Sequence, residues 1–116
     1  MVVDTQEQEE IDRIFRALAD ATRRDIVVRS VRGEHSVSAL ARRYSMSLTA
    51  VQKHVGVLEQ AGLVTKARHG RESLVSTDIR AVRKAQRLLD QLEAVWRHRL
   101  DRFGDVLAES KKGTRP

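Results

Sequence analysis

One stretch decides the fold of this chain: Ser45–Gly62, SMSLTAVQKHVGVLEQAG. Its apolar residues recur at helical spacing and predict a single buried stripe formed by Leu48, Val51, Val55 and Leu58. The opposite face carries small, hydroxyl, amide and basic side chains, namely Thr49, Gln52, Lys53, Gly56 and Gln60. A helix face of this makeup can approach another molecule closely and form hydrogen bonds with it.

The composition limits the size of the protein, the kinds of site that it can hold and its compartment. A chain of 116 residues, 41% hydrophobic and 33% charged, is the size of one domain with a modest core. It contains no cysteine, which excludes disulfides, thiol catalysis and cysteine-based metal sites. No apolar run approaches the roughly 20 residues of a membrane span, and the acidic N-terminus is not a signal peptide. We therefore expect a cytoplasmic protein without a membrane partner.

The charge is unevenly distributed along the chain. Residues 1–12 hold five acidic side chains and no basic one, whereas residues 13–116 hold 22 basic and 11 acidic side chains, a net charge of +11. A basic body of this kind predicts a polyanionic partner. Because aromatic residues make up only 3% of the chain, a base-stacking platform for RNA or single strands is not expected.

The segments on either side of the opening stretch predict four further helices, over residues 6–18, 23–31, 36–43 and 79–108. Good N-cap residues precede three of the helices: Asp20 or Thr22, Ser36 and Ser47. Tyr44–Met46 forms a tight turn between residues 36–43 and the opening helix. Two short helices joined in this way are a helix-turn-helix, whose second helix enters the major groove of DNA.

A β-hairpin is predicted directly after Gly62, which ends the opening helix. Its extended runs are Leu63–Arg68 and Glu72–Ser76, and its tip is Arg68-His69-Gly70-Arg71. A hairpin in this position is a wing, and its basic tip suits phosphates or a minor groove. The predicted fold is therefore mainly α-helical with a small β-hairpin: a winged helix-turn-helix of five helices.

The last helix carries more apolar surface than one small neighbour can cover. Val82, Leu89, Trp96 and Phe103 recur every seven residues along it. An uncovered apolar face on a small domain predicts a homodimer formed through the first and last helices. The predicted interface residues are Ile11, Ile14, Phe15, Leu89, Leu92, Trp96 and Phe103.

The predicted domain organisation is a single domain over residues 1–108. Its DNA-binding core spans residues 20–77, its dimerisation helices span 6–18 and 79–108, and residues 109–116 form a disordered basic tail.

Double-stranded DNA is the expected partner, and the opening helix is expected to read it. Gln52 can pair with adenine, and Lys53 can reach guanine or phosphate. Three roles stay open for His54: reading a base, donating to a phosphate or packing within the protein. For Thr49, Gln52 and Lys53, the alternative to DNA contact is a helix face that is exposed to solvent. The predicted DNA-binding residues are Ser47, Thr49, Ala50, Gln52, Lys53, His54, Arg42, Arg43, Arg68, His69 and Arg71.

Three runs of sequence together resemble one family. They are LADATRRDIV (Leu18–Val27), VSALARRYSMSLTAVQKHVGVLEQAGLVTKARHGRESLVS (Val37–Ser76) and VWRHRLDRFGDVL (Val95–Leu107). They resemble the ArsR-type winged helix-turn-helix transcriptional regulators, the last run a metal-independent branch of them. The resemblance implies a homodimeric repressor that binds a palindromic promoter site, often its own.

The chain departs from the metal-sensing members of that family. The segment Ser36–Ala41 has no thiol, and Asp90 and His98 lack the spacing of a metal site on the last helix. We therefore expect no metal site and no cofactor, and the sequence identifies no small-molecule effector.

Three alternatives come from other classes. An enzyme finds no support, because the chain has no glycine-rich phosphate loop, no nucleophile elbow and no identifiable carboxylate pair. The other two are a zinc-type metal-responsive repressor with an intersubunit His/acid site and a winged helix that binds another protein.

Overall fold

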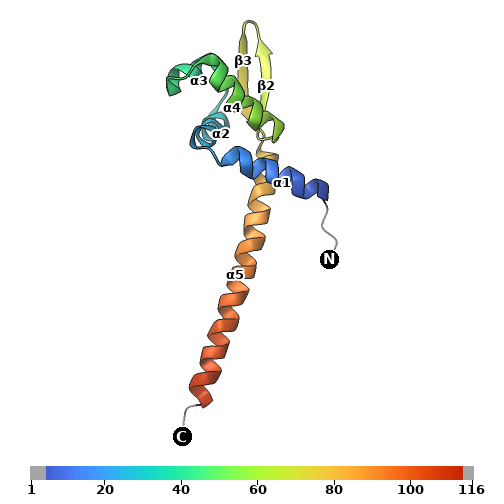
Figure 1. Cartoon of the computed structure of the whole chain (residues 1–116), viewed down its shortest axis with the longest axis vertical. Coiled ribbons are helices and arrows are strands. Elements are labelled where there is room, and N and C mark those ends of the chain that lie inside the picture. Colours follow the sequence, from blue (N-terminus) through green and yellow to red (C-terminus); the bar gives the residue numbers. More distant parts are fainter. Residues whose placement is uncertain (1–4, 114–116) are drawn as a thin grey trace. The chain divides into compact units, whose positions relative to one another are not determined.

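The computed structural model describes residues 5–113 and contains five helices and one small sheet in that part of the chain (Figure 1). The helices are α1 (Thr5–Leu18), α2 (Ala21–Arg32), α3 (Val37–Tyr44), α4 (Leu48–Gln60) and α5 (Ile79–Gly113). The strands are β1 (His35–Ser36), β2 (Val64–His69) and β3 (Glu72–Thr77). The prediction of five helices with a hairpin after the fourth is confirmed.

The described residues divide into two compact units, one ending at Ala85 and one beginning at Gln86. The first unit holds α1 to α4, the sheet and the first turns of α5, and the second holds the remainder of α5. The buried cluster of the first unit includes Ile14 and Ala17 of α1 and Ala81 and Ala85 of α5. The division into a DNA-binding core over residues 20–77 and flanking dimerisation helices stays a prediction.

Local capping explains where the helices of the first unit begin. The side chains of Asp20, Ser36 and Ser47 each accept a hydrogen bond from the backbone N–H three residues later, as N-caps do. Asp78 accepts one from the backbone N–H of Arg80 at the start of α5. The three predicted caps are confirmed, with Asp20 rather than Thr22 preceding α2.

A Schellman motif ends α4. The N–H of Leu63 donates to the carbonyl of Leu58 (2.9 Å) and that of Gly62 to Glu59 (3.0 Å), with Gly62 in the left-handed region at a φ of 74°. The side chains of Leu58 and Leu63 are both fully buried, as the motif favours. The predicted role of Gly62 is confirmed.

The sheet has three antiparallel strands in the order β1-β3-β2 rather than two. His35 pairs with Val75 and Ser36 with Leu74, so the predicted cap Ser36 and the residue before it also form an edge strand. A strand of two residues is too short to show an alternating sequence pattern. It is a strand only because its backbone pairs with β3. The closing pair of the hairpin is His69 with Glu72, which moves the tip to Gly70 and Arg71.

The core lies between the helices and the sheet of the first unit. Fully buried side chains come from α2, α3, α4, the residue that follows the end of α4, and β3. They include Ile26, Leu40, Val51, Val55, Leu58, Leu63 and Val75. Thr77 Oγ1 donates to the carbonyl of Val27 at 3.0 Å and thereby ties β3 to α2.

The last helix is longer than predicted. It continues to Gly113, so residues 109–113 are helical rather than a disordered tail, and the rest of the predicted tail lies outside the described residues. Glu109, Lys111 and Lys112 are good helix formers, which accounts for the continuation up to a glycine. None of the helices in the described part of the chain is long and apolar enough to cross a membrane.

Candidate nucleic-acid interface

The turn between α3 and α4 fixes the direction in which α4 leaves the core. Ser45 lies in the left-handed region at a φ of 52°, the single non-glycine residue at positive φ among those described. The N–H of Met46 donates to the carbonyl of Ala41 at 3.1 Å, and that of Ser45 to Arg42 at 3.3 Å, so a second Schellman motif closes α3. Ser47 then caps α4 by accepting from the N–H of Ala50 at 3.1 Å. The chain thus stops one helix and starts the next within three residues.

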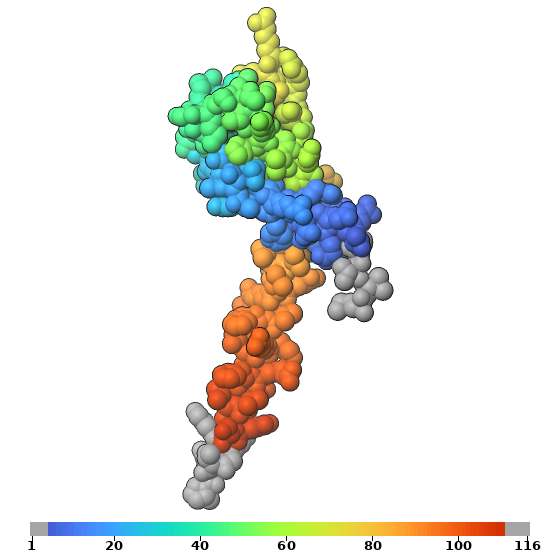
Figure 2. Space-filling view, in the orientation of Figure 1, coloured from blue at the N-terminus to red at the C-terminus, as the bar shows by residue number. Residues whose placement is uncertain are grey.

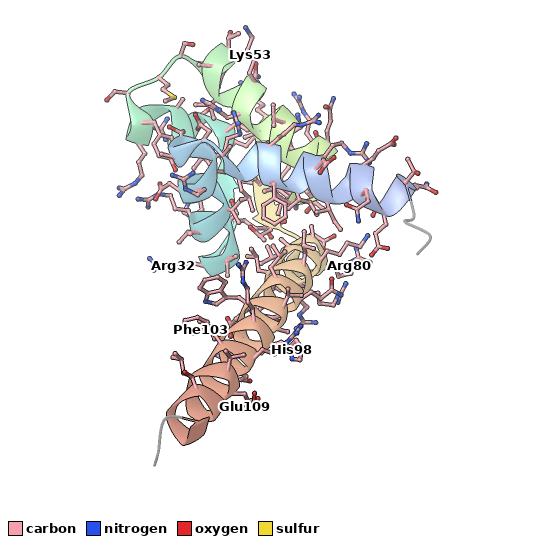
Figure 3. The ribbon with its side chains drawn as sticks, turned by 60° about the horizontal axis from the view of Figure 1, so that its bottom comes forward. Arg32, Lys53, Arg80, His98, Phe103 and Glu109 are labelled. Carbon is pink, nitrogen blue, oxygen red and sulfur yellow. The ribbon has the colours of Figure 1, made fainter. Side chains whose placement is uncertain are left out.

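Polar side chains cover the outer face of α4. Val51, Val55 and Leu58 are fully buried, whereas Thr49, Gln52 and Lys53 are exposed, as the helical periodicity predicts. Figure 3 shows Lys53 projecting from α4 at the edge of the unit. Among the other predicted contacts on this helix, Ser47 is exposed and Ala50 is half-buried.

Leu48 is not part of the buried stripe, which corrects the prediction. Its side chain is 47% exposed in the first turn of α4. Periodicity places it on the inner side, but it is the first residue of the helix and the core does not cover it.

His54 lies beside α4's contact with α1 and α2 rather than on the open face. Its Nδ1 is 3.4 Å from Nη1 of Arg23 and 3.9 Å from the carboxylate of Asp20. Because a guanidinium has only donors, Nδ1 accepts in the contact with Arg23, and the proton of the neutral ring lies on Nε2. His54 is thus half-buried and in contact with Arg23, and its predicted role at DNA stays a prediction.

Arg23 of α2 contacts both α1 and α4. Its Nε donates to the carbonyl of Ala17 at 2.7 Å and its Nη2 to that of Arg16 at 3.1 Å, which satisfies acceptors left free at the end of α1. Arg24 donates in the same way to the carbonyl of Leu18 at 2.8 Å. Both arginines thus donate hydrogen bonds to backbone carbonyls at the end of α1.

A polar contact between α2 and α3 orients the helix-turn-helix. The hydroxyl of Tyr44 donates to Oδ2 of Asp25 at 2.5 Å, and Nε of Arg29 donates to the same oxygen at 2.7 Å. These hydrogen bonds, that of Tyr44 first, lower the pKa of Asp25. Burial, followed by the neighbouring carboxylate, raises the pKa of Tyr44 to about 12. No local pattern reveals this contact, since its partners are 19 residues apart.

The remaining predicted DNA-binding residues all have exposed basic side chains. Arg42 and Arg43 are exposed at the end of α3, and Arg68, His69 and Arg71 are exposed at the end of the hairpin. Figure 2 shows that the hairpin tip, in yellow, stands out from the helices of its unit. Nε of Arg68 makes only a long contact, 3.4 Å, with the carbonyl of Gly70. All these cations are accessible to an anionic partner.

The predicted interface residues fall into two groups. Ile11 and Ile14 are only 8% and 2% exposed, and Phe15 is half-buried, because α1 packs onto the core of its own chain. Ile11 and Ile14 are therefore buried within their own chain, and their place in an intermolecular interface stays a prediction. On α5, in contrast, Leu89, Leu92, Trp96 and Phe103 are all at least half exposed. Figure 3 shows Phe103 projecting from this helix.

No group of three or more His, Asp or Glu side chains in the described part of the chain is arranged to hold a metal ion. The polar side chains gathered on the outer face of the helix-turn-helix and on the wing can instead donate hydrogen bonds and carry positive charge.

Comparison with known proteins identifies this architecture. A model of a helix-turn-helix domain matches residues 13–67. A solved structure of an ArsR family transcriptional regulator, RHA00566, is 30% identical, covers 84% of this chain and 97% of its own, and superposes with a TM-score of 0.74. The chain belongs to the ArsR family of transcriptional regulators.

Two further relatives of this ArsR regulator are informative. It is 46% identical over 67 residues to the HTH-type transcriptional regulator YuzN of Bacillus subtilis (strain 168), covering 52% of this chain and 73% of YuzN. The homodimeric winged helix-turn-helix DNA-binding domain of Mb0332 from Mycobacterium bovis is 25% identical, with 82% and 89% coverage and a TM-score of 0.60. The family consists of DNA-binding regulators, not enzymes, and the resemblance seen in the sequence is confirmed.

Proposed function

We propose that this ArsR regulator is a homodimeric repressor that binds a palindromic site in promoter DNA, its own promoter included. The observation that carries the proposal is the exposed polar face of α4, with Thr49, Gln52 and Lys53 outward and the valines behind them buried. In a helix-turn-helix this face meets base edges in the major groove.

The flanking cations support the same assignment. Arg42 and Arg43 precede the turn, and Arg68, His69 and Arg71 lie on the wing, so positive charge lies on both sides of α4 along the chain. Contacts of this kind to phosphates position a protein on DNA without reading its sequence. We assign base reading to Thr49, Gln52 and Lys53, with Ser47 and Ala50 close to the DNA and His54 reaching it only through Nε2.

We assign the contact with a second copy of the chain to the apolar side of α5. Leu89, Leu92, Trp96 and Phe103 form an open apolar face on α5, and Val95, Leu100, Val106 and Leu107 of the same helix are also exposed. The homodimeric state of Mb0332 favours the same arrangement. A two-fold dimer presents two copies of α4 about 34 Å apart, which matches the half-sites of a palindrome.

Binding to the protein's own promoter tests the proposal. Fluorescence anisotropy would compare the wild type, Lys53→Ala and Arg32→Ala across a salt series. Figure 3 shows Lys53 at the α4 edge and Arg32 at the end of α2, so both changes remove one exposed charge, but only the first alters the proposed site.

We expect Lys53→Ala to weaken binding by about tenfold, with Arg32→Ala close to wild type. The affinity of the wild type should fall by orders of magnitude from low to high salt. A promoter fragment bound equally well at all salt concentrations would contradict the proposal, as would a reporter whose expression rises when the protein is added.

A further inference from the structure

We infer that Leu48 is a specificity-determining residue that contacts the C5-methyl group of one thymine in each half-site. The inference rests on the proposed function, because it requires α4 to lie in the major groove. Its starting point is the exposure of Leu48, a large apolar side chain that is 47% accessible in the first turn of α4, whereas Val51, Val55 and Leu58 of the same helix are fully buried.

The position of Leu48 places it among the proposed base readers. It is the first residue of α4 and is followed at once by exposed Thr49. Exposed Gln52 is four residues further on, and residues at this spacing lie next to each other on a helix surface. The first turn of a recognition helix is the part that faces base edges.

The chemistry of the groove identifies the partner of this side chain. Base edges in the major groove present hydrogen-bond donors and acceptors and one apolar group, the methyl of thymine. A leucine offers neither donor nor acceptor, so burying it against polar base edges would remove water from those edges without replacing its hydrogen bonds. Against a thymine methyl, both apolar surfaces leave water together.

Val57 provides a matched control within the same helix. It is also a branched apolar residue and is 40% exposed. It lies nine residues after Leu48, which at 3.6 residues per turn is the opposite side of the helix. Val57→Ala therefore removes comparable exposed apolar surface from α4 without touching the face that carries Gln52.

The test combines a protein variant with a DNA variant. The full chain first selects a duplex from a random-sequence pool, and each thymine of that duplex is then replaced in turn by deoxyuridine, which lacks only the methyl group. For the wild type, one replacement in each half-site should weaken binding about fourfold, the effect of one buried methyl.

Leu48→Ala should bind the methylated site about fourfold more weakly and lose its sensitivity at that thymine. Val57→Ala should keep both the affinity and the sensitivity. The circular-dichroism spectra of both variants should match the wild type, because neither side chain is in the core.

Two results would overturn the inference while leaving the proposed function standing. One is sequence-specific binding in which Leu48→Ala keeps its full response to every deoxyuridine. The other is a loss of self-association in Leu48→Ala with unchanged methyl sensitivity, which would assign the side chain to a protein contact. A pool from which no sequence is enriched would instead contradict the proposed function and the inference with it.

Discussion

At the scale of single residues, the hydroxyl of Tyr44 is the most informative group outside the face of α4. It donates to Asp25, which also accepts from Arg29. Tyr44→Phe should lower the free energy of unfolding at neutral pH by about 1 kcal/mol, because both groups are partly exposed and the contact is screened. Urea unfolding followed by circular dichroism measures this change.

The same contact gives the pH dependence of stability a definite sign. The pKa of Asp25 is lowered in the folded chain, chiefly by the hydrogen bond from Tyr44. Its contribution is therefore present above the ordinary pKa of about 4 and is lost as the pH falls through the folded value. The difference between wild type and Tyr44→Phe should shrink from pH 7 toward pH 3. A difference of equal size at both ends, or an Asp25→Asn/Tyr44→Phe double variant whose losses simply add, would rule out this pairing.

At the scale of elements, alanine substitutions at Gly56, within α4, and at Gly62, just after its end, should change stability in opposite directions. Gly62 has a φ of 74°, where a Cβ is strained, whereas Gly56 lies within the helix, where nothing comes within 4 Å of an added Cβ. Gly62→Ala should destabilise the chain by about 1–2 kcal/mol, and Gly56→Ala should stabilise it by up to about 1 kcal/mol. Thermal unfolding of the two variants side by side would show this, and a shift of the same sign in both would contradict the assigned motif.

Elements defined by local chemistry are the ones that the sequence predicts well. Asp20, Ser36, Ser47 and Gly62 act through atoms within a few residues, so their roles can be read without the fold. Strand β1 cannot be found in this way, since two residues become a strand only when β3 lies beside them. The contact of Tyr44 with Asp25 and the exposure of Leu48 likewise depend on which distant segments reach those side chains. On the candidate face of α4, the sequence therefore predicts the polar residues correctly and misplaces the one large apolar residue.

At the scale of the whole molecule, Trp96 reports on self-association. It is the only tryptophan of the chain and its side chain is 56% exposed. If α5 pairs with a second copy, the fluorescence of the wild type should shift to shorter wavelength as the protein concentration rises. Trp96→Ala should sediment as a monomer at micromolar concentration, because removing a large aromatic from an interface costs about 2 kcal/mol or more.

Asp101→Ala is the matched control for this experiment. Asp101 is exposed on the same helix, five residues after Trp96 and away from its apolar side. This variant should remain as dimeric as the wild type. A Trp96→Ala protein that stays fully dimeric would move the main interface away from α5.

The strand order β1-β3-β2 has a consequence for the behaviour of the protein in concentrated solution. The most apolar strand, β3, has a neighbour on both sides, a strand of two residues on one and β2 on the other, and the exposed residues of β2 include Lys66 and Arg68. Lysine and arginine on an edge strand discourage other chains from extending the sheet. Arg68, one of the proposed DNA contacts, and its neighbour Lys66 therefore also guard against fibrillar aggregation. Wing variants intended to weaken DNA binding should replace these residues with glutamine or glutamate, since valine or threonine at the same positions would open an edge on which chains can stack.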